Sequence, residues 1–195
     1  MLQTHAFYGH EGIVNAHKLY KLFRDTKAFS GSELNIEGAT LLTAGNGTTR
    51  WIRFFQRGNG APRDGLLPIS ATCDVRLDDL LAFVHAPQLR APPALFNIVA
   101  FDLDRIGANR LPLGFTDATE LPPRDPSGAG GSDGAMRRKD NMPAVLYLAG
   151  AEDSPDVFHD GPVAGSVVGV ASCAHDASDF RATECEVCLG AGVCS

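Results

Sequence analysis

The stretch ATLLTAGNGTTRWIRFFQ, residues 39–56, decides the fold expected for this chain. Two β-prone runs, Ala39 to Ala44 and Thr48 to Gln56, flank the tripeptide Gly45-Asn46-Gly47. Glycine and asparagine tolerate the positive φ angles of tight hairpin turns, while β-branched and aromatic residues favour strands. The stretch therefore predicts a β-hairpin, and a hairpin joins its two strands in antiparallel order.

Apolar runs on both sides of the hairpin predict the other elements. Residues Ile13 to Phe29 carry apolar side chains at roughly helical spacing, which predicts one long amphipathic helix. Asp78 and Asp79, at the start of LDDLLAFVHA, favour a short helix that Pro87 ends. Further strands are expected in four runs: Leu66 to Val75, Leu95 to Leu103, Ala144 to Ala149 and Val163 to Ala171.

The composition changes between Pro112 and Met142, where Pro, Gly, Ser and charged residues predict a long loop. A chain of 195 residues suits a single domain with an extension. We therefore expect an α+β domain over residues 1–172, with a mainly antiparallel sheet, one long N-terminal helix and a Gly/Pro-rich loop at residues 112–142. A cysteine-rich C-terminal element, residues 173–195, is expected to follow.

Charge narrows the classes of partner. The chain has 17 Lys and Arg against 23 Asp and Glu, a formal net charge of -6, which argues against a nucleic-acid partner because it repels a phosphate backbone. Basic and aromatic residues of the hairpin could stack bases, but an exposed charged face of a strand is the simpler interpretation. These residues are Arg50, Arg53, Arg57, Trp51, Phe54 and Phe55.

Neither a signal peptide nor a membrane-spanning segment is expected. The N-terminal residues lack a charged start followed by an unbroken apolar stretch, and no stretch approaches the roughly 18 consecutive apolar residues of a membrane helix. The sequence predicts a soluble protein without membrane contact, located in the cytoplasm or within a virus particle.

Four of the five cysteines, Cys173, Cys185, Cys188 and Cys194, lie near the C-terminus. A C-x-x-C pair lets two thiolates reach one ion, and a tetrahedral zinc then needs two more ligands from nearby chain. We predict a structural zinc held by these four cysteines, with His175 as an alternative ligand. Two disulfides, or four free thiols, are the other interpretations of the same pattern.

The segment Cys185-Glu-Val-Cys188-Leu-Gly190-Ala-Gly192 resembles the C-x-x-C-x-G-x-G unit in the cysteine-rich domain of J-domain co-chaperones. The resemblance covers eight residues. It implies a local zinc-knuckle geometry around Cys185 and Cys188.

A second resemblance concerns acidic residues. The apolar run from Asn97 ends in Asp102-x-Asp104, and it resembles the first motif of haloacid dehalogenase-like phosphotransferases. The resemblance implies Asp102 as the nucleophile, Asp104 as the acid and base, and Mg²⁺ held by such carboxylates. Residues Leu146 to Asp156 resemble the acidic metal-binding motif of the same family, which implies roles for Asp153 and Asp156 and a Rossmann-like arrangement of strands.

The sequence contains no G-x-S-x-G elbow, no phosphate-binding P-loop and no H-E-x-x-H motif. The lack of these motifs, and a long loop and tail that a neighbouring subunit could hold in place, favour a protein that is not an enzyme. We predict a structural or accessory subunit of a large macromolecular assembly, such as a virus particle, that acts through contacts with other protein subunits. A Mg²⁺-dependent phosphotransferase and a small zinc-binding interaction module are the alternatives.

Overall fold

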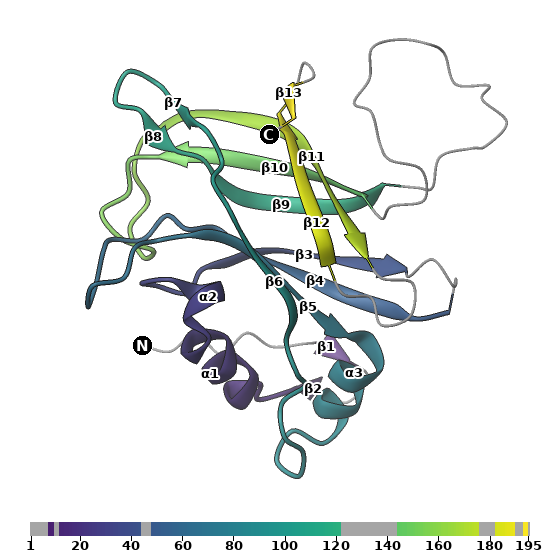
Figure 1. The fold of residues 1–195 in the computed structure, drawn as a ribbon. Coiled ribbons are helices and arrows are strands. Elements are labelled where there is room, and N and C mark those ends of the chain that lie inside the picture. The colour runs from purple at the N-terminus through teal and green to yellow at the C-terminus, as the bar shows by residue number, and fades with distance from the viewer. Residues whose placement is uncertain are drawn as a thin grey trace, which may run out of the picture.

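The structure is a computed structural model that describes the backbone of residues 8–9, 12–43, 48–121, 144–175, 182–189 and 193–194. Side chains are described for residues 14–43, 48–121 and 144–172. Most of the described elements are strands, and the two larger antiparallel sheets that they form lie face to face (Figure 1).

The first sheet has the strand order β3-β4-β5-β6. Its strands are β3 (Ile36–Thr43), β4 (Arg50–Gln56), β5 (Ser70–Arg76) and β6 (Phe96–Phe101). Each pair of neighbours is antiparallel. The predicted pairing of the runs around residues 45–47 is confirmed, because β3 and β4 pair with Leu41 opposite Ile52.

The second sheet has the strand order β13-β12-β11-β10-β9 and is also antiparallel. Its strands are β9 (Gly114–Leu121), β10 (Ala144–Glu152), β11 (Val163–His175), β12 (Ala182–Leu189) and β13 (Val193–Cys194). Two short hairpins complete the described strands: β1 (Tyr8–Gly9) with β2 (Gly12–Ile13), and β7 (Arg105–Ile106) with β8 (Leu111–Pro112).

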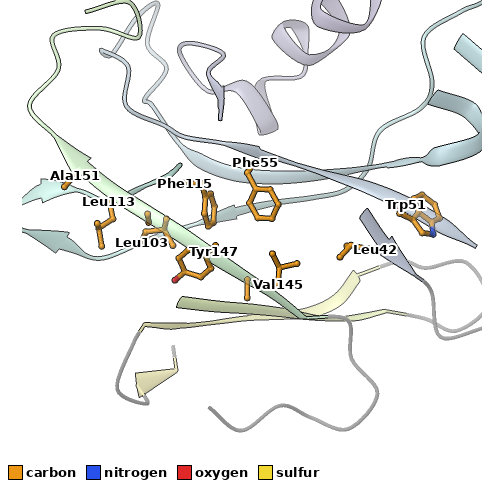
Figure 2. Close-up of a cluster of buried hydrophobic side chains, with 11 residues drawn as sticks. Leu42, Trp51, Phe55, Leu103, Leu113, Phe115, Val145, Tyr147 and Ala151 are labelled. Atoms are coloured by element: carbon orange, nitrogen blue, oxygen red, sulfur yellow. The ribbon is translucent and has the colours of Figure 1, made fainter. Parts of the chain in front are cut away.

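An aromatic core fills the space between the two sheets (Figure 2). The ring of Phe115 on β9 meets Phe55 of β4 and Tyr147 of β10 edge to face, with centroids 5.2 Å apart in both pairs. Trp51 of β4 packs on Phe96 of β6 in the same way, also at 5.2 Å. Edge-to-face rings combine burial of apolar area with favourable quadrupole contacts, so this cluster joins the sheets.

A helical layer covers the opposite face of the first sheet (Figure 1). It consists of α1 (His17–Asp25), α2 (Lys27–Ser30) and α3 (Leu77–His85). Phe23 of α1 packs against Phe29 of α2 and Phe54 of β4, with centroids 5.5 and 5.0 Å away. Because successive residues of a strand alternate between faces, Phe54 serves this second core while Phe55 serves the core between the sheets.

The expected α+β domain with one long N-terminal helix is wrong. The chain is mostly antiparallel sheet, and its three described helices are short. The predicted helix over residues 13–29 breaks at Thr26, whose φ of −82° and ψ of 84° are not helical. The amide of Thr26 already donates to Leu22, and the next residues start α2, so two short helices replace one long helix.

Two further expectations change in the second sheet. Part of the predicted loop at residues 112–142 is the strand β9, which pairs with β10 in antiparallel order. Residues 122–143 lie outside the described residues. The expected cysteine-rich tail contributes two strands to this sheet. Among the described residues, no helix is long and apolar enough to cross a membrane.

Candidate functional site

The four acidic residues predicted as alternative catalytic groups lie in loops. Asp102 and Asp104 follow β6 and are exposed, and Asp104 accepts a hydrogen bond from the backbone N–H of Arg105 at 2.7 Å. Asp153 and Asp156 lie between β10 and β11. Over the described part of the chain, no three His, Cys, Asp or Glu residues gather in a group that could hold a metal ion.

The surroundings of Asp102 and Asp104 also differ from those that the phosphotransferase resemblance implies. Strand β6 pairs with β5 in antiparallel order, whereas a Rossmann-like arrangement places such carboxylates after a strand of a parallel sheet. The described strands therefore do not supply the framework of that mechanism.

The predicted zinc ligands are described only by their backbone. Cys173 and His175 are in β11, Cys185 and Cys188 in β12, and Cys194 in β13. Their side chains lie outside the described residues, so the zinc site stays a prediction. The fifth cysteine, Cys73, is a free thiol buried in β5, and burial raises the pKa of this thiol far above its usual range.

The basic and aromatic residues of β4 form no exposed stripe. Arg53 is fully buried, and its Nε and Nη2 atoms bind the two carboxylate oxygens of Asp74 at 2.7 and 2.8 Å. Asn97 donates to the same carboxylate at 2.8 Å. In this network the buried charges of the arginine and the aspartate pair with each other. The ion pair therefore has a structural role and does not require a ligand.

Three connections form one end of the sandwich, which we call the loop end: residues 57–69, 105–112 and 153–162 (Figure 1). The β7–β8 hairpin approaches β11 closely, since a Cβ atom added at Gly107 would lie 3.2 Å from that of Ala164. The other two connections are joined through the first residue after β4, Arg57.

Arg57 links both sheets at the loop end. Its Nη2 atom lies 2.5 Å from Oε2 of Glu152, the last residue of β10, and its Nη1 atom lies 3.6 Å from Oε1 of Glu37 in β3. The backbone of Arg57 is fixed as well, because its carbonyl accepts from the hydroxyl of Ser70 at 2.9 Å. The β4–β5 loop and the β10–β11 loop therefore both begin at a residue of this ion pair.

Glu152 also fixes the far side of its own loop. Its Oε1 atom accepts from the backbone N–H of Gly161 at 2.6 Å, and Asp153 N–H donates to the carbonyl of Pro162 at 3.1 Å. A Cβ atom at Gly161 would lie only 1.9 Å from the carbonyl oxygen of Asp153, so this close approach requires glycine. Burial alone would raise the pKa of Glu152, but the hydrogen bonds from Gly161 and Arg57 outweigh burial and lower it.

The tip of the β10–β11 loop is a hydrogen-bonded turn around Asp156. One carboxylate oxygen, Oδ1, accepts from the backbone N–H groups of Phe158 at 2.8 Å and His159 at 3.1 Å. The backbone hydrogen bond from Phe158, followed by the side-chain hydrogen bond from the ring of His159, lowers the pKa of Asp156. The turn presents the ring of Phe158 to solvent, where 80% of the residue's surface is exposed.

The neighbouring β4–β5 loop is fixed in a similar way and presents Leu67. Arg63 and Leu66 exchange backbone hydrogen bonds at 3.0 and 2.9 Å, and the carbonyl of Leu67 accepts from Ser32 N–H at 3.0 Å. The guanidinium of Arg63 lies 2.5 Å from Glu33. Leu67 is nevertheless among the most exposed large apolar residues of the described chain.

The loop end thus combines exposed apolar side chains with a backbone held by hydrogen bonds, and its β10–β11 loop is acidic. The β10–β11 loop alone contains Asp153, Asp156 and Asp160 and no Lys or Arg. This arrangement suits recognition of a surface. The titratable pair at the tip of this loop, His159 and Asp156, has Nδ1 2.8 Å from Oδ1 and belongs to the turn itself.

Sequence reasoning named Arg57, Asp153 and Asp156 in other roles and missed Glu152 and Phe158. Arg57 and Glu152 are far apart in sequence. Their ion pair forms only when the two sheets pack together, so no local sequence pattern predicts it. Phe158 had one usable signal: a lone aromatic residue within DSPDVFHDGP, residues 153–162, where turn-forming and acidic residues predict exposure.

Comparison with known proteins places the chain in a family. A family model described as "Family of unknown function (DUF6910)" matches residues 4–185. The match spans most of the chain, and the chain belongs to this family. Neither the curated proteins nor the solved structures include a match to it.

Proposed function

We propose that this member of the DUF6910 family is an accessory subunit of a protein assembly, and that it contacts its partner through the loop end. The proposal rests on one observation above all: Phe158 is 80% exposed on a loop whose two sides are tied together. An exposed aromatic ring on a fixed loop has no evident use in the folding of this chain.

The energetics favour a role in association. Transfer of a Phe side chain from water into an apolar site is worth about 1.5–3 kcal/mol. A partner that bound a mobile loop would lose part of this gain in ordering the loop, whereas the hydrogen bonds of Asp156, Glu152 and Gly161 already order this one. Aromatic residues presented in this way are typical centres of protein interfaces.

Charge defines the partner further. The carboxylates of Asp153, Asp156 and Asp160 surround Phe158 in the sequence, so the complementary surface is a protein with an apolar pocket bordered by Lys or Arg. A second copy of this chain fits poorly, because two copies with a formal net charge of -6 repel each other.

Site-specific crosslinking tests the proposal. A photoreactive phenylalanine analogue is placed at position 158 of the full chain in its native host, and at position 89 as a matched control. Leu89 is 89% exposed, but it follows α3 outside the loop end. The proposal expects position 158, and not 89, to give a covalent adduct with one defined protein that carries a basic-rimmed pocket.

Two results would overturn it. Identical adducts from both positions would show that position 158 has no special role. An adduct with the mass of two copies of the chain would replace the proposed partner with self-association.

A further inference from the structure

The strand register places the four C-terminal cysteines in two opposed pairs. Strand β12 pairs with β11 so that Cys185 lies opposite Cys173, and it pairs with β13 so that Cys188 lies opposite Cys194. Both ladders are antiparallel, and the three strands lie side by side at the yellow-green edge of the second sheet (Figure 1). The two cysteines of each pair therefore lie opposite each other on neighbouring strands.

The two pairs occupy opposite faces of the sheet. Residues directly opposite each other across a ladder belong to the same face, and residues an odd number of positions apart on one strand belong to different faces. Ala171, opposite Val187, is part of the core between the sheets. Cys173 is two positions after Ala171, and Cys185 is two positions before Val187, so both belong to that inner face. Cys188, three positions from Cys185, belongs to the outer face with Cys194.

This placement suits two dithiols better than one site with four ligands. Opposed residues of an antiparallel ladder have Cα atoms about 4.5–5.5 Å apart. Disulfides span Cα separations of about 4.4–6.8 Å, so either pair can close without movement of the strands. A zinc ion needs four sulfur atoms at about 2.3 Å around one point, and the sheet itself separates these two pairs.

We propose that the C-terminal edge of the second sheet is a two-disulfide modification site with the connectivity Cys173–Cys185 and Cys188–Cys194. The oxidant is a low-molecular-weight disulfide such as oxidised glutathione. In each pair one thiolate attacks the small disulfide and releases one small thiol, and the opposite cysteine then attacks the mixed disulfide and releases the second. One Sγ–Sγ bond forms for each small disulfide reduced to two thiols.

The bridges would fasten β12 and β13 to β11. Strand β13 has two residues and forms the edge of the sheet, and such short edge strands have few contacts of their own. The site is separate from the loop end and does not depend on the proposed partner.

Peptide mapping of the full chain tests the connectivity. The reduced protein is equilibrated with oxidised glutathione, then digested with trypsin and a glutamate-specific protease, which cut after Arg181, Glu184 and Glu186. These cuts separate Cys173, Cys185 and the peptide 187–195. The expected products are a Cys173 peptide joined to a Cys185 peptide, and a peptide 187–195 that lacks two hydrogens. Cys73, which is buried, should stay a thiol.

Single substitutions sharpen the result. Cys185→Ser should abolish the first bridge and leave the second, Cys194→Ser should do the reverse, and Cys73→Ala should keep both. A bridge between Cys185 and Cys188, or between Cys173 and Cys188 in the Cys185→Ser variant, would overturn the proposal. So would one zinc per reduced chain that is lost in each of the four single Cys→Ser variants, because that result requires all four thiolates at one ion.

Discussion

The substitution Glu152→Gln should lower the free energy of unfolding by about 2 kcal/mol at neutral pH. Glu152 binds Arg57 at 2.5 Å, and their side chains are only 8% and 12% exposed. Hydrogen bonds to charged groups contribute about 1.5–3 kcal/mol, and loss of one partner of a buried pair costs about 3–5 kcal/mol. The lower range applies because Gln retains an oxygen for Gly161 N–H, and because Arg57 keeps Glu37 at 3.6 Å.

Glu37→Gln is the matched control. Glu37 faces the same guanidinium, but it lies farther away and its side chain is 33% exposed, so solvent screens the pair. The expected cost is below about 1 kcal/mol. Urea unfolding of the three proteins at neutral pH measures both values, and for a chain of this size the 2 kcal/mol loss corresponds to a melting temperature about 4–8 °C lower.

The pH dependence gives the decisive readout. The pKa of Glu152 is lowered in the folded protein from its ordinary value of 4.5. The stabilisation is therefore fully present above pH 4.5 and is lost as the pH falls through the lower, folded pKa. The difference between the wild type and Glu152→Gln should therefore be smaller in acid, below pH 4.5, than at neutral pH. An equal difference at both pH values, or equal costs for Glu37→Gln and Glu152→Gln, would refute the assigned role of this ion pair.

Three further outcomes follow from the described contacts. Arg53→Met should cost about 3–5 kcal/mol in urea unfolding because it leaves the carboxylate of Asp74 buried without its cation, and the double variant with Asp74→Leu should cost less than the sum of the single variants. Gly161→Ala should lower the melting temperature, because the added methyl group meets the carbonyl of Asp153; an unchanged melting temperature would show that the loop is not held there. Tyr147→Phe should leave stability within about 0.5 kcal/mol or raise it, since among the described atoms the buried hydroxyl has no hydrogen-bond partner. In the wild type, burial raises the pKa of Tyr147 to about 12, so an ultraviolet titration should lose its last tyrosine step in this variant.

Much of the first sheet could be predicted from sequence because its signals are local. The run around residues 45–47 joins β-prone segments, and the structure pairs them as β3 and β4. Asp78 and Asp79 likewise mark the first turn of α3. The prediction of one long N-terminal helix was wrong because of tertiary packing. Phe23 and Phe29 both pack inward only if the chain turns at Thr26.

The second sheet was harder to predict because its evidence is nonlocal. Strand β9, GFTDATEL, alternates small and polar residues and lacks an apolar run, yet Phe115 makes it part of the core. The four C-terminal cysteines suggested one metal site when read as a linear motif. The ladder register places Cys185 opposite Cys173, a pairing that the linear motif does not contain, and the zinc site itself stays a prediction.

The most direct test of the central claim is an equilibrium binding measurement with the purified partner identified by crosslinking at position 158. Calorimetric titration should show that Phe158→Ser weakens binding about 30-fold or more, the effect of a central aromatic contact worth about 2 kcal/mol. The control Leu89→Ser, equally apolar and exposed in the parent, should bind within about twofold of the wild type. Equal affinity of all three proteins would contradict a role for the loop end in partner binding.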